Sequence, residues 1–252
     1  IVKTVSKGEK DALIRMCESY AEHCEGNPDT LIQYLGCHSI RLPLNTRKIY
    51  FVVMRNVLPG RKLDATFDLK GATANRQRVR GRELAQLLAG ARTPASFRTL
   101  LDKDWMALGM TLHLAAAMRR QLLATVVADA KFCLENRLID YSLLLGVSKD
   151  DKGESDIATS GTDGELYYVG LIDILEGWRT KWFIQEGVLK FFFRYICCHM
   201  WYNPEGITAI PPHEYAARFV EFIEREVLRM EPTSDHMSAD DGGYRKSWYP
   251  FW

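Results

Sequence analysis

Ile139-Asp140-Tyr141-Ser142-Leu143-Leu144-Leu145-Gly146-Val147 is the stretch from which the rest of this chain can be arranged. Its apolar part predicts a short buried strand that directly follows an acidic residue. A second short apolar segment, Leu166–Leu175, carries Asp173 near its end. Two aspartates on adjacent short strands can point into one cleft, and with Lys3 on an earlier strand they are the minimum set for phosphoryl transfer with bound magnesium. On spacing alone, three solvated surface charges remain the simpler explanation, because a lysine and two aspartates occur in most proteins.

The segments on either side of these strands predict an α+β fold. Apolar residues at three- and four-residue steps predict an amphipathic helix over Lys7–Cys24. Tyr34–Arg41 and Lys48–Asn56 are predicted as strands, and the second is apolar on both faces, so we expect it in the centre of a sheet. A long apolar stripe predicts a buried helix over Trp105–Glu135. The polar stretch 148–165 is predicted to be a mobile loop.

The composition limits the classes of partner. The chain has 252 residues, of which 47% are hydrophobic and 26% charged, and this fits one large domain or two modest lobes. The net charge is only +1, which argues against nucleic acid as a partner, so any charged partner must be met by a local patch. No apolar run reaches the roughly 18 residues of a membrane-spanning helix. The six cysteines include no C-x-x-C pair, which favours reduced thiols in a cytosolic compartment.

Several common phosphate-binding signatures do not occur in the sequence. It contains no G-x-x-x-x-G-K-[ST] loop, no G-x-G-x-x-G fingerprint, and none of the H-R-D, D-F-G and A-P-E motifs. The P-loop NTPases, the dinucleotide-binding enzymes and the ordinary protein kinases are therefore excluded.

A different set of strings follows a fixed order along the chain: Phe67-Asp68-Leu69-Lys70-Gly71-Ala72, Ile139–Leu144, Gly170-Leu171-Ile172-Asp173-Ile174-Leu175, and Gly206–Ile210 running into Tyr215–Phe219. Together with the opening Ile1-Val2-Lys3-Thr4-Val5, this series closely resembles the phosphatidylinositol phosphate kinase family. Several landmarks in the right order, from Ile1 to about Met230, are far more specific than any single motif.

The resemblance implies a two-lobed fold like a distorted protein kinase, with an antiparallel sheet lobe and a mainly helical second lobe. The catalytic domain would cover residues 1–231, with a first lobe over about 1–60, a second over about 61–231, an activation-loop-like segment over 174–206, and a tail over 232–252. Because the chain opens inside a strand, we expect the early strands of the first lobe to be missing from it, together with the glycine-rich loop that covers the phosphates.

The resemblance also assigns roles to residues within these strings. Lys3 would contact the phosphates of ATP, Asp140 would orient the inositol hydroxyl and accept its proton, and Asp173 would hold Mg²⁺ against the β- and γ-phosphates. Asp68 and Lys70 would complete the catalytic set, facing the cleft and the membrane. The hinge that receives adenine should bind mostly through the backbone of four residues: Val53, Met54, Arg55 and Asn56.

Basic residues gather in two places that such an enzyme would turn towards a lipid. Between Lys70 and Arg82 the chain carries several basic residues and no acidic one, and arginine side chains bind phosphate monoesters in a bidentate manner. The segment between Asp173 and Gly206 mixes aromatic with basic residues, as interfacial elements do. A solvated loop and a packed helix remain the alternatives for these two segments. The predicted lipid and membrane ligands are Lys70, Arg76, Arg78, Arg80, Lys190 and Arg194.

These expectations describe an ATP- and Mg²⁺-dependent phosphoinositide kinase, cytoplasmic and peripheral to the cytosolic face of a membrane, that converts phosphatidylinositol 4-phosphate into phosphatidylinositol 4,5-bisphosphate. Its partners would be an inositol lipid and an anionic membrane surface, with no nucleic acid, and a homodimer is possible. Phosphatidylinositol 3-phosphate is an alternative substrate. A second hypothesis is a kinase-shaped module that binds phosphoinositide membranes with little or no activity, because the visible chain lacks the glycine-rich loop.

Overall fold

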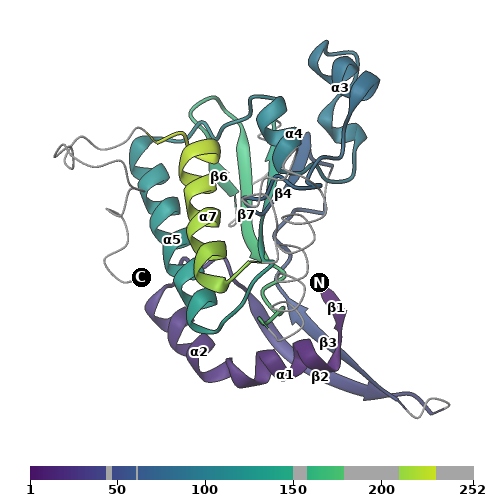
Figure 1. Cartoon of the computed structure of the whole chain (residues 1–252), viewed down its shortest axis with the longest axis vertical. Helices are drawn as coiled ribbons and strands as arrows, with labels where there is room; N and C mark the ends of the chain where they lie inside the picture. The colour runs from purple at the N-terminus through teal and green to yellow at the C-terminus, as the bar shows by residue number, and fades with distance from the viewer. Residues whose placement is uncertain (44–46, 61, 150–157, 179–209, 231–252) are drawn as a thin grey trace, which may run out of the picture.

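The computed structural model describes residues 1–43, 47–60, 62–149, 158–178 and 210–230 of the chain. These residues form two antiparallel β-sheets with helices packed around them (Figure 1). The predicted α+β class is therefore confirmed.

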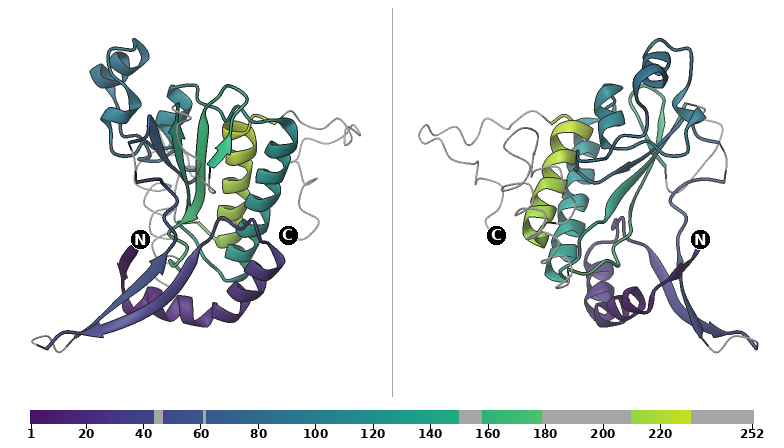
Figure 2. Two further views of the ribbon diagram at one scale, coloured as in Figure 1. Left: turned by 180° about the vertical axis from the view of Figure 1, so that it is seen from behind. Right: turned by 45° about the vertical axis from the view of Figure 1, so that its right-hand side comes forward.

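The first sheet has the strand order β1-β3-β2, with β1 at Val2–Val5, β2 at Tyr34–Arg41 and β3 at Lys48–Met54. Both pairings are antiparallel, and the apolar β3 is the central strand, as its sequence predicts. Helices α1 (Lys7–Arg15) and α2 (Cys17–Gly26) follow β1. The β2–β3 hairpin extends away from the rest of the molecule (Figure 2).

The second sheet has the strand order β4-β5-β7-β6 and is also antiparallel. Its strands are β4 (Ala65–Leu69), β5 (Ser142–Ser148), β6 (Ala158–Ser160) and β7 (Leu166–Ile172). Nearly every residue of the two central strands is buried. This burial on both faces explains why β5 and β7 stand out in the sequence as continuous apolar runs.

Further helices follow the first sheet along the chain. In the described residues they include α3 (Gly81–Leu88), α4 (Asp102–Ala107), α5 (Ala116–Glu135) and α7 (Pro212–Phe222), with short turns of other helix types at η1 (Pro94–Ser96) and η3 (Ile223–Val227). Helices α5 and α7 lie side by side in every view, whereas α3 projects from one end of the molecule (Figures 1 and 2). In the described part of the chain, no helix combines the length and the apolar composition needed to cross a bilayer.

Aromatic contacts in the core fix α7 over the start of β5. The ring of Tyr141 forms edge-to-face contacts with Tyr215 and Phe219 of α7, at centroid distances of 4.8 and 5.1 Å. A similar contact of 4.9 Å joins Phe67 of β4 to Trp105 of α4. Such pairs contribute about 0.5–1.5 kcal/mol each beyond the burial of their apolar area. The residue before Tyr141 is Asp140, so this packing holds the backbone that carries one of the predicted site residues.

The predicted helix Trp105–Glu135 is wrong over its first part. Helix α4 ends at Ala107, Gly109 has a φ of +61° that a helix does not continue through, and α5 begins only at Ala116. Of the residues between, Leu112 and Leu114 are buried in the core without being helical, and the backbone N–H of Leu112 donates to the carbonyl oxygen of Val227.

Other differences from the sequence prediction are smaller. The single helix predicted over Lys7–Cys24 is divided at Met16 into α1 and α2. The loop predicted over 148–165 is shorter, because Ala158–Ser160 forms the edge strand β6 against β7, while 150–157 lies outside the described residues. Strand β4 and helix α3 were not predicted.

Candidate active site

Three neighbouring strands of the second sheet carry predicted site residues at the same end of the sheet, here called the site edge. In the antiparallel register, the first residue of β5 pairs with the last residue of β7, and the last residue of β4 pairs with the second residue of β5. Asp140 precedes β5, Asp173 follows β7 and Lys70 follows β4. The pairing of the strands therefore brings together three residues that are far apart in the sequence.

The backbone around the two aspartates is well defined. The N–H of Ile139 donates to the carbonyl oxygen of Glu176 at 3.0 Å, so the segment after Asp173 runs beside the segment before Asp140. Both aspartates have a φ of +63°, in the left-handed region. Asp and Asn adopt this conformation more readily than other residues with a side chain.

Lys3 of β1 reaches this edge from the first sheet. Its Nζ atom lies 2.5 Å from Oδ1 of Asp173, and the two side chains are 48% and 41% exposed. A cavity of about 290 Å³ opens beside this ion pair. Its lining consists of Lys3, Glu9, Tyr34, Asp140, Asp173, Leu175 and Glu176.

Four of the lining residues, Glu9, Tyr34, Leu175 and Glu176, were not predicted as site residues. The Glu9 carboxylate accepts from the Ser6 backbone N–H at 2.7 Å, and the Glu9 N–H donates to the Ser6 hydroxyl, which completes a capping box at the start of α1. The S-x-x-E spacing in the sequence could have identified this cap. Burial, and to a smaller extent the charge of Asp173, raises the pKa of Tyr34, so its hydroxyl stays protonated beside the cavity.

Lys70 lies behind the cavity and holds Asp140. Its Nζ atom lies 2.7 Å from Oδ1 of Asp140 and donates to the carbonyl oxygen of the same residue at 2.5 Å. The side chain of Lys70 is only 10% exposed. The ammonium group of Lys70 therefore contacts both the carboxylate and the backbone of Asp140. Lys70 and Asp140 both belong to the predicted catalytic set.

Asp68 and Arg76 are engaged with each other. Asp68 lies on β4 between two fully buried neighbours and therefore points to the opposite side of the strand from them. The NH2 atom of Arg76 lies 2.9 Å from Oδ1 of Asp68, and its Nε atom donates to Oδ2 of Asp102 at 2.7 Å. The contacts of Asp68 and Arg76 thus stabilise the 70–76 loop. The catalytic role of Asp68 and the lipid-binding role of Arg76 stay predictions.

Helix α4 supplies two buried carboxylates that the sequence analysis missed. Asp102 accepts from the backbone N–H of Lys70 at 2.8 Å, in addition to Arg76. Asp104 accepts from the backbone N–H groups of Arg78 and Val79 at 2.8 and 3.0 Å. The sequence signal for these two residues is weak: two acidic residues lie two positions apart next to apolar residues. The same pattern also occurs on exposed helices, so it does not indicate burial.

The remaining predicted lipid ligands divide into two groups. The side chains of Arg78 and Arg80 are exposed, and so is that of Arg82 next to them. Arg78 also donates from Nε to the carbonyl oxygen of Thr99 at 2.9 Å. Lys190 and Arg194, like most of the predicted activation-loop-like segment 174–206 and the tail 232–252, lie outside the described residues.

The four predicted hinge residues lie where the first sheet joins the second. Val53 and Met54 end β3, and the N–H of Met54 donates to the carbonyl oxygen of Ile1 at 2.9 Å. Arg55 and Asn56 line a separate cavity of about 300 Å³ next to α5. Among the described residues, none of the four lines the cavity at Lys3.

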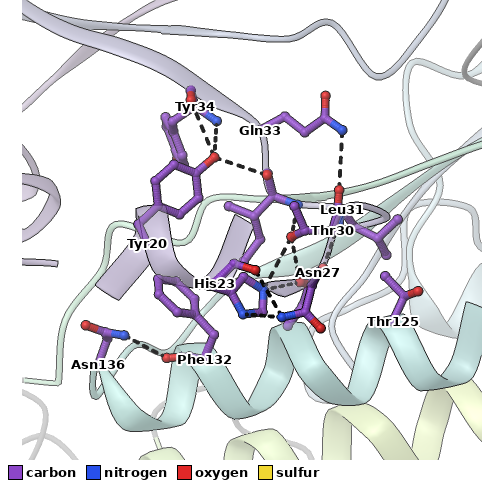
Figure 3. A network of polar contacts seen from close by, with 12 residues as sticks. Tyr20, His23, Asn27, Thr30, Leu31, Gln33, Tyr34, Thr125, Phe132 and Asn136 are labelled. Atoms are coloured by element: carbon purple, nitrogen blue, oxygen red, sulfur yellow. Dashed lines mark hydrogen bonds and ion pairs between the residues drawn. The ribbon is translucent and has the colours of Figure 1, made fainter. Parts of the chain in front are cut away.

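A buried network of polar contacts connects the segment before β2 with helices α2 and α5 (Figure 3). Asp129 of α5 is fully buried and accepts from Thr30 and from the Leu31 N–H at 2.7 and 2.8 Å, and His23 of α2 lies 2.6 Å from it. The carbonyl oxygen of Leu31 accepts from the N–H of Leu171 in β7 at 3.0 Å. This network links α2, α5 and β7 through the segment that precedes β2.

The comparison with known families accounts for these residues together. A sequence profile described as phosphatidylinositol-4-phosphate 5-kinase matches residues 1–164 and 152–226, which include Lys3, Asp140 and Asp173. The chain belongs to this family. The assignment made from the ordered strings is thereby confirmed.

Several curated proteins are similar to this family member. A phosphatidylinositol 4-phosphate 5-kinase of Schizosaccharomyces pombe is 36% identical over 62% of this chain and 20% of its own length. A phosphatidylinositol 4-phosphate 5-kinase of Plasmodium falciparum is 29% identical over 90% of this chain and 14% of its own length. The human phosphatidylinositol 5-phosphate 4-kinase type-2 beta is 29% identical over 62% of this chain and 35% of its own length. The chain thus spans only about a seventh to a third of these relatives.

Proposed function

We propose that the chain carries the catalytic site of a phosphoinositide kinase that transfers the γ-phosphate of ATP to the headgroup of a phosphatidylinositol monophosphate. The observation that carries the proposal is the convergence of Lys3, Asp140 and Asp173 on one cavity of about 290 Å³. We propose phosphatidylinositol 4-phosphate as the substrate and phosphatidylinositol 4,5-bisphosphate as the product. The names of the Schizosaccharomyces and Plasmodium relatives support this choice.

The proposal includes a two-lobed, kinase-like arrangement around this cavity. The first sheet with α1 and α2 would be the nucleotide side, because it contributes Lys3. The second sheet with α5 and α7 would be the substrate side, because it contributes both aspartates. Transfer in line between two such sides needs positioning and charge neutralisation rather than covalent chemistry by the protein.

The side chains at this edge have separate tasks in the proposed reaction. The ammonium group of Lys3 would contact a phosphate of ATP in exchange for its present contact with Asp173. The carboxylate of Asp140 would orient the inositol hydroxyl and accept its proton as the phosphoryl group is transferred. Lys70 would keep that carboxylate in place through its two contacts with Asp140.

The carboxylates that surround the cavity fit a magnesium ion. Mg²⁺ prefers oxygen ligands and usually binds through one or two carboxylates together with substrate phosphates. Asp173 would hold it, since its side chain is 41% exposed at the cavity. Bound there, the ion would neutralise the charge of the β- and γ-phosphates.

The surface that carries Arg78, Arg80 and Arg82 would face the lipid. All three side chains are exposed: Arg78 and Arg80 lie on the segment that leads into the projecting helix α3, and Arg82 lies in the first turn of that helix (Figure 1). Basic residues near an anionic leaflet contribute about 1 kcal/mol each. The protein would accordingly act as a cytoplasmic enzyme at the cytosolic face of a membrane.

The test is a kinase assay on the full-length protein, with radiolabelled ATP and vesicles that each contain one monophosphorylated inositol lipid. We expect product from phosphatidylinositol 4-phosphate at a rate at least about tenfold above the 3-phosphate and the 5-phosphate. Product mainly from the 5-phosphate would support a 4-kinase, and product mainly from the 3-phosphate would overturn the substrate assignment. Binding to these vesicles without any product would support the inactive membrane-binding module instead.

A further inference from the structure

We propose that Asp102, which lies outside the cavity, is a positioning residue for the phosphoryl-transfer site. Its carboxylate would hold the 70–76 loop in the arrangement from which Lys70 reaches Asp140. The inference rests on the proposed kinase function, and it assigns a role to a side chain that touches neither the cavity nor the predicted substrates.

The two oxygens of Asp102 serve two different parts of the loop. Oδ1 accepts from the backbone N–H of Lys70 at 2.8 Å and from that of Ala72 at 3.3 Å. Oδ2 accepts from Nε of Arg76 at 2.7 Å. Asp102 is fully buried, so water does not compete for these contacts.

The charge of Asp102 is balanced by Arg76. Burial lowers the pKa of Arg76, but Asp102 and then Asp68 outweigh this effect and raise it above its usual value. The guanidinium group therefore stays charged between the two carboxylates, 14% exposed. Bonds between charged partners are shorter and stronger than neutral ones, so this part of the loop is held firmly.

Helix α7 closes the other side of the loop. Gly71 has a φ of +66°, and a Cβ atom placed on it would lie 3.0 Å from the carbonyl oxygen of Arg218 and 3.1 Å from Cα of Phe219. The loop is thus confined between Asp102 and the backbone of α7. With the loop backbone so confined, the direction in which Lys70 leaves it is determined.

The consequence for catalysis follows from the contacts of Lys70. Its Nζ atom holds the carboxylate of Asp140 at 2.7 Å, and the backbone N–H of the same lysine is held by Asp102. A displacement of about 1 Å in a reacting group can cost on the order of 10²-fold in rate. Asp102 therefore acts on Asp140 through a single intervening residue.

Asp104 provides a matched control on the same helix. It is 1% exposed, and it accepts from the N–H groups of Arg78, Val79 and Leu101 at 2.8, 3.0 and 2.9 Å. The contact with Leu101 lies at the start of α4. Loss of its charge therefore loosens the same helix as loss of the Asp102 charge, without removing a bond to Lys70.

The experiment compares Asp102→Asn with Asp104→Asn in the full-length protein. Melting temperatures, kcat and the KM for ATP are measured on vesicles that contain the preferred monophosphorylated lipid at saturation. We expect similar decreases in melting temperature for both variants. Only Asp102→Asn should lower kcat by about tenfold or more, with the KM for ATP within about twofold of wild type, because the nucleotide contacts of Lys3 are untouched.

The second part of the experiment tests whether the effect passes through Lys70. Lys70→Met preserves the length of the buried side chain and removes its ammonium group. In that background, Asp102→Asn should lower kcat by less than twofold, since residues that act as one unit are not additive. A tenfold decrease in both backgrounds would overturn the positioning role.

A third variant covers the case in which Asp102→Asn unfolds below the assay temperature. Asp102→Glu keeps the negative charge that Arg76 needs but shifts the oxygens by one methylene, so it should fold and still lower kcat by about tenfold. Wild-type kcat in Asp102→Glu, or equal decreases in Asp102→Asn and Asp104→Asn, would overturn this inference alone. A wild-type protein without lipid kinase activity would overturn the proposed function, and this inference with it.

Discussion

Two ion pairs at the site edge differ in how deeply they are buried. The side chains of Lys3 and Asp173 are 48% and 41% exposed beside an open cavity. Those of Arg76 and Asp102 are 14% and 0% exposed, where Asp102 of α4 holds the 70–76 loop against α7. An exposed pair contributes about 0–1 kcal/mol to stability, whereas breaking a buried one costs about 3–5 kcal/mol.

This difference in burial indicates which of the two ion pairs can open to bind a ligand. Lys3 and Asp173 can separate at little cost, so both are suited to bind a phosphate group and its metal ion. The buried pair would leave an uncompensated charge if it opened, so it is suited to hold the loop in place. Lys70 and Asp140 connect the two regions, with side chains that are 10% and 36% exposed. Substitutions in the exposed region should therefore change activity, and substitutions in the buried region should change stability as well.

The largest effect is expected for Asp173→Asn. The proposed metal ligand loses its charge with almost no change in volume, so turnover should fall by about 10³-fold or more. The melting temperature should change by less than about 2 °C, since an exposed ion pair contributes little. Radiolabelled product formation and thermal melting on the same preparation check both statements. A loss of stability comparable to that of Asp102→Asn would contradict the contrast between the two regions.

A smaller decrease is expected for Asp140→Asn. Loss of the group that orients the hydroxyl and accepts its proton should lower kcat by about 10²-fold. The KM for ATP should stay within about twofold, because Lys3 and Asp173 remain. Steady-state kinetics with varied ATP provides the measurement, and a large rise in this KM would instead place Asp140 among the nucleotide contacts.

The exposed arginines Arg78, Arg80 and Arg82 should affect membrane binding without affecting stability. The triple variant Arg78→Ser, Arg80→Ser, Arg82→Ser should bind anionic vesicles on the order of 10²-fold more weakly at low salt, from about 1 kcal/mol for each residue. Its melting temperature should be nearly unchanged, unlike that of Arg76→Gln. Vesicle co-sedimentation at several salt concentrations measures the binding and its salt dependence.

A charge-matched control separates local from overall electrostatics. Serine substitutions of Lys7, Arg15 and Arg225 remove the same charge from exposed positions on other helices. We expect these to weaken vesicle binding by less than about threefold. Equal weakening by both triple variants would mean that net charge, and not this surface, determines membrane binding.

The smallest effect is expected on stability alone, and it is measured by comparing the Gly71→Ala and Gly81→Ala variants. Both glycines have positive φ angles, of 66° and 51°, but a Cβ atom on Gly81 would meet open space. The backbone strain of about 1 kcal/mol is common to both. The contact with α7 should bring the loss of unfolding free energy for Gly71→Ala to about 2–3 kcal/mol. Denaturant unfolding of both variants measures the difference, and equal losses would show that α7 does not confine the loop.

Much of this arrangement could be predicted because it lies in continuous runs of sequence. Strands β2 and β3 have the predicted starts, and the buried strands β5 and β7 appear as apolar runs with Asp140 and Asp173 beside them. The family resemblance supplied the role expected of Lys3. These features depend on local pattern and order, which one sequence contains.

The unpredicted features depend on contacts between distant segments. Asp102 is recognisable only through hydrogen bonds to residues about 30 positions earlier, and nothing in its neighbours indicates them. The break after α4 has the same origin, because the backbone N–H of Leu112 donates to the carbonyl oxygen of Val227, a residue far along the chain that no local pattern indicates. Strand β4 was missed because it has only five residues, one of them Asp68.

The left-handed backbone at Asp140 and Asp173 determines what an alanine scan of this site would report. Alanine at a φ of +63° adds backbone strain of about 1–2 kcal/mol to the loss of the carboxylate. In a saturation-mutagenesis library, the variants at each of these two positions should therefore fall into two groups. Asn and Gly variants should accumulate to wild-type abundance without activity, whereas β-branched variants should lose abundance first, so that their lost activity reports on the backbone and not on the chemistry.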